Sequence, residues 1–197
     1  MRFPIHSSFA VVALAFLLSA CSESFTVSRD GQSYVVVKIG NLTWMAENLN
    51  FETAGSFCPE GDSRNCKRLG RLYSWAEAKS VCPDGWRLPM KEDFEALVAA
   101  QSSSQSRAGA TLKASDGWFK KGNGSDALGF RALPAGYRGA DGKFDGIGGY
   151  AYFWSATEDS ENRESNAFYL FLSFSSDAAS INAFAKDDYR SVRCVMP

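Results

Sequence analysis

Four cysteines constrain the fold of this chain more than any other feature. The N-terminal residues have the features of an export signal, and exported proteins keep paired cysteines oxidised. An even number of cysteines therefore predicts two disulfides among Cys58, Cys66, Cys82 and Cys194. Four cysteines allow three connectivities, and the sequence alone does not choose among them. Loop length favours a local Cys58–Cys66 bond, which leaves a long-range Cys82–Cys194 bond.

The N-terminal segment predicts export and lipid anchoring. Residues 9–18 form an apolar run that is shorter than the roughly 20 residues of a membrane-spanning helix and fits the core of a signal peptide. Small residues then precede Cys21, an arrangement that resembles the bacterial lipobox, in which the cysteine thiol receives a diacylglycerol. The alternative is an ordinary signal peptide with an incidental cysteine. We predict a signal peptide over residues 1–20, lipidation of Cys21 and a polar tether over residues 21–29.

Lipidation would make the membrane a partner of this protein. More than one acyl chain gives stable anchoring. A serine directly after the cysteine, here Ser22, resembles the sorting signal for the outer membrane of Gram-negative bacteria. We therefore expect an exported protein that is anchored to the cell envelope, in the outer membrane.

Length and charge bound the remaining chain. Residues 30–197 are enough for one domain with a sizeable core. The net charge of −1 becomes −2 once Arg2 is removed with the signal peptide. Nucleic-acid binding requires a concentrated basic face, so a nucleic-acid partner is not expected.

Hydrophobic patterning predicts a hairpin and two short helices. The β-branched run 34–39 and residues 42–46 flank a Gly-Asn turn and predict two paired strands. A helix is expected over residues 72–81, with Ser74 as a possible N-cap. A second helix is expected over residues 90–100, where apolar side chains recur at helical spacing.

The remaining segments predict loops and then strands, which completes an α+β pattern. Residues 52–69 and 117–149 are rich in glycine, and the first also in charged residues, so both are expected to be loop regions. In residues 166–174, Phe168, Leu170, Leu172 and Phe174 share one face of a strand and Tyr169, Phe171 and Ser173 share the other. Further strands are expected over residues 152–155, 181–185 and 191–195.

Several sequence blocks resemble one known family. The string DGQSYVVVKIGNLTWMAENLN is similar to the Fibrobacter succinogenes major paralogous domain, and so are GRLYSWAEA, VCPDGWRLP, SDALGFRALPAGYR, FWSATE and VRCV. These blocks run in order from Asp30 to Val195. The family's function is undefined, and its members look like exported, often lipid-anchored surface proteins.

A wider resemblance concerns the fold. A helix that ends in a cysteine bonded to a cysteine of the last strand is similar to the C-type-lectin-like fold. The segment WRLP and the terminal RCV also resemble the formylglycine-generating branch of that fold. The resemblance implies two short helices, small antiparallel sheets, a long loop region and the Cys82–Cys194 bond.

Catalytic groups are sparse. Formylglycine-generating relatives use a cysteine pair near the C-terminus, and here Cys194 stands alone there. The only histidine, His6, leaves with the signal peptide, which excludes histidine-dependent catalysis and metal binding. Zinc is also disfavoured because no CxxC pair is present. A glycosidase mechanism with paired carboxylates remains an alternative, with Asp126, Asp141, Asp145 and Glu158 available.

Calcium-dependent sugar binding is not supported. The Glu-Pro-Asn, Gln-Pro-Asp and Trp-Asn-Asp strings of calcium-binding lectins are absent. Asp141 and Asp145 lie in a segment that superficially resembles a calcium loop. Lys143, however, occupies a position where an oxygen ligand is required, so a turn is favoured over a metal site. We expect no metal, no cofactor and no catalysis.

Aromatic residues in or near the glycine-rich region are the candidates for ligand binding. Sugars have apolar C–H faces that stack on exposed rings, and Trp118, Tyr137, Tyr150, Tyr152 and Trp154 could form such a platform. The alternative is that these rings fill the core. With polar neighbours included, the predicted ligand-binding set is Trp118, Asp126, Tyr137, Arg138, Trp154 and Glu158.

The expected function follows from these observations. An anchored, loop-rich protein without catalytic machinery predicts a surface module that binds a polysaccharide or another surface protein. One alternative is a structural envelope lipoprotein without a small ligand, which would expose a large apolar patch. The other is a hydrolase, which needs two carboxylates about 5–10 Å apart beside a cleft.

Overall fold

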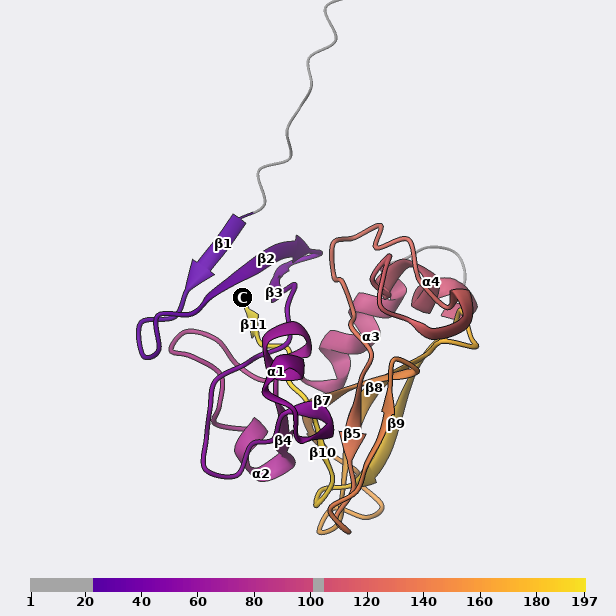
Figure 1. The fold of residues 1–197 in the computed structure, drawn as a ribbon. Coiled ribbons are helices and arrows are strands. Elements are labelled where there is room, and N and C mark those ends of the chain that lie inside the picture. The colour runs from indigo at the N-terminus through magenta and orange to yellow at the C-terminus, as the bar shows by residue number, and fades with distance from the viewer. Residues whose placement is uncertain (1–22, 101–104) are drawn as a thin grey trace, which may run out of the picture.

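The computed structural model describes residues 23–100 and 105–197. The predicted signal peptide and the predicted lipid attachment site, Cys21, lie outside the described residues. In the described part, two sheets and short helices form a mainly β structure (Figure 1). None of the helices there has the length and apolar character needed to cross a membrane.

The first sheet is antiparallel and has the strand order β1-β2-β3-β11. Its strands are β1 (Glu23–Thr26), β2 (Ser33–Ile39), β3 (Leu42–Met45) and β11 (Val195–Met196). The predicted hairpin is confirmed as β2–β3, with Gly40 at a positive φ of 62° in its turn. The strand β1 lies within the predicted tether. It forms there because the open edge of β2 offers backbone partners and because Phe25 packs on Trp86.

The second sheet is mixed and has the order β6-β5-β10-β7-β8-β9, with β4 also paired to β10. The sequence predicted small antiparallel sheets. This sheet is instead large, with seven strands, and it is mixed, because the pairing of β10 with β7 is parallel. Its strands are β4 (Leu72–Ser74), β5 (Ala135–Arg138), β6 (Phe144–Ile147), β7 (Tyr150–Glu158), β8 (Asn166–Ser173), β9 (Ala179–Ala185) and β10 (Tyr189–Ser191).

The expectation of a long loop over residues 117–149 is wrong in part, because β5 and β6 lie within it. Gly136 has a positive φ, and a Cβ there would collide with the carbonyl oxygen of Asp145 on β6. Glycine at this position therefore permits close strand approach rather than loop formation.

Four α-helices occur in the described residues, two more than predicted: α1 (Ser63–Leu69), α2 (Trp75–Ala78), α3 (Lys91–Ala99) and α4 (Ala108–Leu112). Three short 3-10 turns accompany them: Pro59–Gly61, Gln105–Arg107 and Phe119–Lys121. The predicted second helix is confirmed as α3. The predicted first helix is shorter than expected, because residues 72–74 pair with β10 and Ser74 caps α2 by accepting a hydrogen bond from the Glu77 N–H.

Helix α1 lies in the segment that was expected to be a loop. Asp62 caps it by accepting a hydrogen bond from the Arg64 N–H, and the Cys58–Cys66 disulfide closes the segment. Both predicted disulfides are present, and the second joins Cys82, after α2, to Cys194, between β10 and β11. That bond spans 112 residues and holds the two halves of the domain together.

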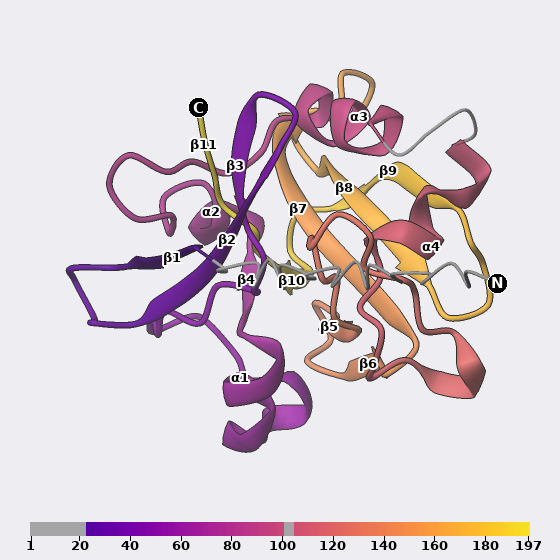
Figure 2. The same ribbon diagram turned by 90° about the horizontal axis from the view of Figure 1, so that it is seen from above.

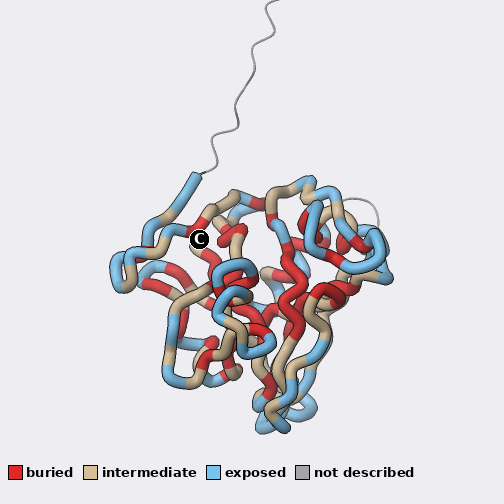
Figure 3. The backbone as a smooth tube through the Cα atoms, viewed as in Figure 1, coloured by how far each residue is buried: buried red, intermediate tan, exposed pale blue. Residues whose placement is uncertain are grey.

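The core lies between the sheets and the helices, where buried residues concentrate in Figure 3. All five tryptophans are buried. On one face of β7 and β8, Phe153, Leu170 and Leu172 pack with Phe94 of α3 and Leu112 of α4, and Figure 2 shows both helices beside these strands. The opposite face of the same strands points away from α3 and α4, contacts Trp75 of α2 at one end, and leads to the candidate site.

Candidate functional site

The face of the second sheet that points away from α3 and α4 carries a row of aromatic rings. Strand pairing places Trp154, Tyr169 and Asn182 side by side across β7, β8 and β9. It also places Tyr152 beside Phe171 on the same face. The predicted alternation is thus confirmed within β8, because Tyr169 and Phe171 share this face while Leu170 and Leu172 face the helices. Phe174 follows the end of β8, and its ring centroid is 6.0 Å from that of Tyr150.

A hollow of about 180 Å³ opens on this face, and we call it the aromatic hollow. Four of its side chains are aromatic and two are charged: Tyr137, Tyr152, Tyr169, Phe184, Asp188 and Arg190. The ring centroids of Tyr137 and Tyr152 are 5.3 Å apart, and those of Tyr152 and Tyr169 are 5.7 Å apart. These are normal aromatic contact distances, so the walls are packed against one another rather than loosely placed.

A buried ion pair forms the polar part of the aromatic hollow. Arg190 is only 2% exposed, and its Nη2 donates to Oδ2 of Asp188 at 2.7 Å. Its guanidinium lies over the rings of Tyr169 and Trp154, at 4.3 and 4.6 Å from their centroids. The charge is therefore held by a carboxylate on one side and by aromatic faces on the other.

The electrostatics of this ion pair are set by burial. Burial lowers the pKa of Arg190 and raises the pKa of Asp188, although each partner's charge opposes the shift of the other. The Arg190 Nε is buried and has no hydrogen-bond partner in the described part of the chain. This unpaired donor sets Arg190 apart from most buried polar groups, which are hydrogen-bonded.

The strand order explains why these residues meet. The three-residue strand β10 lies between β5 and β7, so Arg190 enters the middle of the sheet from a segment far from Tyr137 and Tyr152 in sequence. Phe184 reaches the hollow from β9 and is 55% exposed. An exposed aromatic ring at the rim and a buried charge at the base make a site that can bind a ligand with both apolar and polar faces.

Two of the predicted binding residues are core residues instead. Trp154 is 0% exposed, and its Nε1 donates to the Tyr73 carbonyl oxygen at 2.9 Å. Trp118 is 6% exposed, and its Nε1 donates to the Ala132 carbonyl oxygen at 3.1 Å. A buried ring cannot stack on a sugar, so neither tryptophan forms a platform. Trp154 instead packs against the guanidinium of Arg190.

The other predicted residues are scattered. Tyr137 is the one member of the predicted set that lines the aromatic hollow. Arg138 follows it on β5 but stacks elsewhere, with its guanidinium 4.1 Å from the centroid of the Phe57 ring. Asp126 accepts a hydrogen bond from the Arg131 N–H at 2.7 Å. Glu158 pairs with Lys186 at 2.8 Å, and the hydrogen bond from Lys186 lowers the pKa of that carboxyl.

Of the two acids in the segment that resembles a calcium loop, Asp141 lies in the turn between β5 and β6 and Asp145 lies on β6 itself. Asp141 accepts hydrogen bonds from both the backbone N–H and the side chain of Lys143, which lowers the pKa of Asp141. Asp145 is exposed on β6. Within residues 23–100 and 105–197, no three His, Cys, Asp or Glu side chains are arranged to hold a metal ion.

Sequence reasoning missed four residues of the aromatic hollow: Tyr169, Phe184, Asp188 and Arg190. The alternation in residues 166–174 carried a signal for Tyr169, because it separated this ring from the leucine face. No local signal marked Arg190, because its neighbours in space come from β5, β7 and β8.

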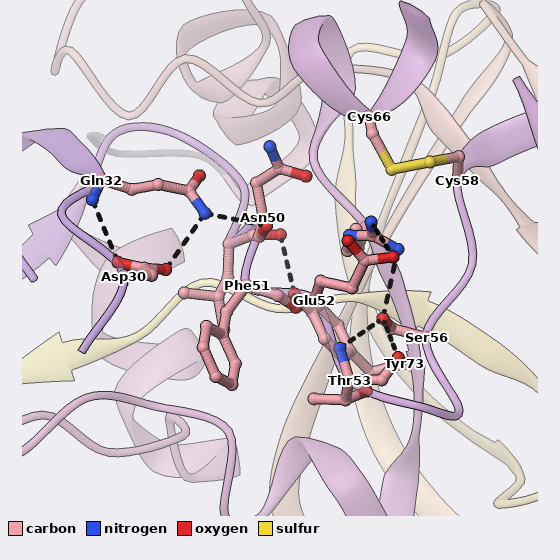
Figure 4. Close-up of polar contacts among 12 residues, drawn as sticks. Asp30, Gln32, Asn50, Phe51, Glu52, Thr53, Ser56, Cys58, Cys66 and Tyr73 are labelled. Atoms are coloured by element: carbon pink, nitrogen blue, oxygen red, sulfur yellow. Dashed lines mark hydrogen bonds and ion pairs between the residues drawn. A yellow bond between two sulfur atoms is a disulfide. The ribbon is translucent and has the colours of Figure 1, made fainter. Parts of the chain in front are cut away.

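A second hollow, of about 140 Å³, is lined mainly by polar side chains, among them Gln32, Asn50, Arg68 and Arg131. Figure 4 shows the contacts beside it. Gln32 donates to the carboxylate of Asp30 and to the Asn50 carbonyl oxygen. The Tyr73 hydroxyl donates to the carbonyl oxygen of Phe51 at 2.7 Å.

These bonds, with the nearby Cys58–Cys66 disulfide, attach the segment after Asn50 to the framework. One buried acceptor, Asn50 Oδ1, has no partner in the described residues. The polar hollow lacks stacked rings and a buried ion pair, so the aromatic hollow is the stronger candidate for a ligand site.

Comparison with known proteins identifies a family. The model of the Fibrobacter succinogenes major domain matches residues 37–196. Searches of curated proteins and of solved structures found no match to the chain. The matched region contains every residue of the aromatic hollow.

Proposed function

The chain belongs to the Fibrobacter succinogenes major domain family, and from this premise we propose that it is a non-catalytic surface module that binds an uncharged glycan in the aromatic hollow. One observation carries the proposal: three tyrosines and a phenylalanine surround a buried Asp188–Arg190 pair. Sugars combine apolar C–H faces with hydroxyls. The aromatic rings can stack on the C–H faces, and the ion pair can hydrogen-bond with the hydroxyls.

The charge of the site supports an uncharged ligand. Asp188 and Arg190 neutralise each other, so the hollow offers no unpaired charge to an ionic group. The aromatic faces near Arg190 are already occupied by its guanidinium, which would repel a cationic ligand.

The lack of catalysis is part of the proposal. A glycosidase mechanism needs two carboxylates beside the scissile bond. The lining of the aromatic hollow supplies one carboxylate, Asp188, and this group is engaged by Arg190. Two of the carboxylates considered from the sequence, Asp141 and Glu158, are paired with lysines.

We extend the proposal to location and to fold type. The lipobox-like sequence before Cys21 supports a lipid anchor in the outer membrane, and two disulfides are consistent with an exported protein. The Cys82–Cys194 bond between the end of a helical segment and the last strands supports a C-type-lectin-like fold. Mass spectrometry of the native N-terminus tests the anchor, because an unmodified Cys21 would contradict it.

A glycan-array experiment with two matched variants tests the binding function. We expect wild-type protein, oxidised and lacking residues 1–21, to bind at least one neutral glycan. Phe184→Ala should weaken that binding about ten-fold or more, which corresponds to roughly 1.4 kcal/mol for one stacked ring. Phe168→Ala is the control, since Phe168 lies on the opposite face of the same sheet. Unchanged binding by Phe184→Ala, or no neutral glycan bound by wild type, would contradict the proposal.

A further inference from the structure

Another hollow lined by aromatic rings lies further along the same sheet, and we call it the second aromatic hollow; the aromatic hollow described above is the first. The second aromatic hollow has a volume of about 510 Å³, and its lining includes Phe119, Phe144, Tyr150 and Phe174, with Glu60 and Asp145. Phe119 is 54% exposed. Its backbone N–H donates to the Gly148 carbonyl oxygen at 2.8 Å, and its ring lies so close to Gly148 that a Cβ there would collide with it. This ring is therefore held in place by backbone contacts although water reaches it.

A continuous strip of rings connects the two hollows. Tyr150 lines the second aromatic hollow. Its ring centroid is 6.2 Å from that of Tyr152, which lines the first aromatic hollow. Phe171 lies beside both, at 5.8 Å from Tyr150 and 5.1 Å from Tyr152. Phe174 extends the strip, with its centroid 6.0 Å from that of Tyr150. We call this set the aromatic strip.

The exposed rings lie at the ends of the strip. In the described part of the chain, the large hydrophobic side chains that are exposed are Met90, Phe119 and Phe184. Two of these three line the two hollows, one in each. Exposed aromatic rings cost solvation free energy, so their presence at both ends of one strip points to a ligand that spans it.

The charges along the strip restrict the ligand further. The second aromatic hollow contains two acids, Glu60 and Asp145. Two cations lie beside its rings: Lys120 Nζ is 5.6 Å from the Phe174 ring centroid, and the Arg138 guanidinium is 5.8 Å from the Phe144 ring centroid. The first hollow contributes a neutral pair. The acids and cations along the strip are thus balanced, which favours an uncharged polymer over a polyion of either sign.

We propose that the site takes a run of several consecutive sugar residues of a linear, uncharged polysaccharide, laid along the aromatic strip from Phe184 to Phe119. This inference rests on the proposed glycan-binding function. A pyranose residue is about as long as one step between neighbouring rings of the strip, so successive residues can stack in turn. The first hollow, with Asp188 and Arg190, supplies the polar contacts, and the second adds stacking.

Chain-length dependence tests this inference. The probes are cello-, xylo- and manno-oligosaccharides of two to six residues, measured by calorimetry on the oxidised protein. For at least one series, affinity should rise about ten-fold or more from the dimer to the hexamer. Phe119→Ala should remove most of this gain and leave dimer affinity unchanged, whereas Phe184→Ala should weaken binding of every length.

The outcomes separate the two proposals. Equal affinity for dimer and hexamer, or a Phe119→Ala variant that binds the hexamer like wild type, would overturn the extended site and leave the proposed function intact. Failure of every neutral glycan to bind would overturn both. Because Phe119 is exposed, Phe119→Ala should keep the unfolding midpoint of wild type, and this measurement verifies that the variant folds.

Discussion

Two buried arginines, three residues apart near the C-terminus, have contrasting surroundings. Arg193 is 0% exposed and donates to Asn48 Oδ1 and to the carbonyl oxygens of Met45, Phe130 and Arg131. Arg190 is almost as buried, but it has one carboxylate partner, an unused Nε and a hollow beside it. The first arginine connects framework segments, whereas the second forms the base of a candidate site.

The contrast shows that burial alone does not separate structural from functional charges. Hydrogen-bond satisfaction differs between the two: Arg193 donates to four acceptors, whereas Arg190 donates to one carboxylate and its Nε has no partner in the described residues. Burial lowers the pKa of both guanidiniums, to about 9 for Arg193. The shift therefore does not distinguish them.

The largest expected effect comes from Arg193→Met. The substitution removes a buried charge and leaves Asn48 Oδ1 and three carbonyl oxygens without a donor. We expect the free energy of unfolding to fall by about 3–5 kcal/mol. Urea unfolding with the disulfides intact measures this change. A loss below about 1 kcal/mol would show that Arg193 is not a framework residue.

A smaller stability effect is expected for Arg190→Met. It removes one charged hydrogen bond, so the free energy of unfolding should fall by about 1.5–3 kcal/mol, while glycan affinity falls about ten-fold or more. The double variant Asp188→Asn with Arg190→Met should recover part of the stability, because no unpaired carboxylate is left, but none of the affinity. Wild-type affinity in either variant would contradict a role for this pair in the site.

The smallest effect concerns pH. The partners of Arg193 are amide and carbonyl oxygens, which do not titrate, whereas Asp188 does. Burial raises the pKa of Asp188, so the folded protein binds this proton more tightly than the unfolded chain does. The resulting contribution to stability is complete below the ordinary pKa of 3.8 and is lost as pH rises through the folded pKa.

Comparing wild type with Asp188→Asn by urea unfolding between pH 3 and pH 7 isolates this contribution. The stability of wild type relative to the variant should fall with rising pH in the window above 3.8. The same comparison in an Arg193→Lys background should give the same slope, because Arg193 is not coupled to this titration. A difference that rises with pH would show that pairing with Arg190 outweighs burial.

Much of the local structure was predictable from short-range patterns. The β2–β3 hairpin, helix α3 and the two faces of β8 follow from periodicities that are visible within ten residues. The local clip between Cys58 and Cys66 followed from cysteine parity and loop length. Glycine misled the prediction at Gly136, because the same residue serves loops and close strand contacts, and only the neighbouring strand distinguishes them.

The sequence by itself therefore determined the family, the oxidised cysteine pairs and the elements that local periodicity encodes. Only the tertiary structure decided that β10 inserts between β5 and β7, which brings Arg190 close to Tyr152 and Tyr169. Only the tertiary structure decided, too, that Trp118 and Trp154 are buried. The physical reason is the distance along the chain over which each kind of interaction acts. Periodicity and turn chemistry act between neighbours along the chain, whereas the aromatic hollow is built from contacts between strands distant in sequence, whose order no local pattern specifies.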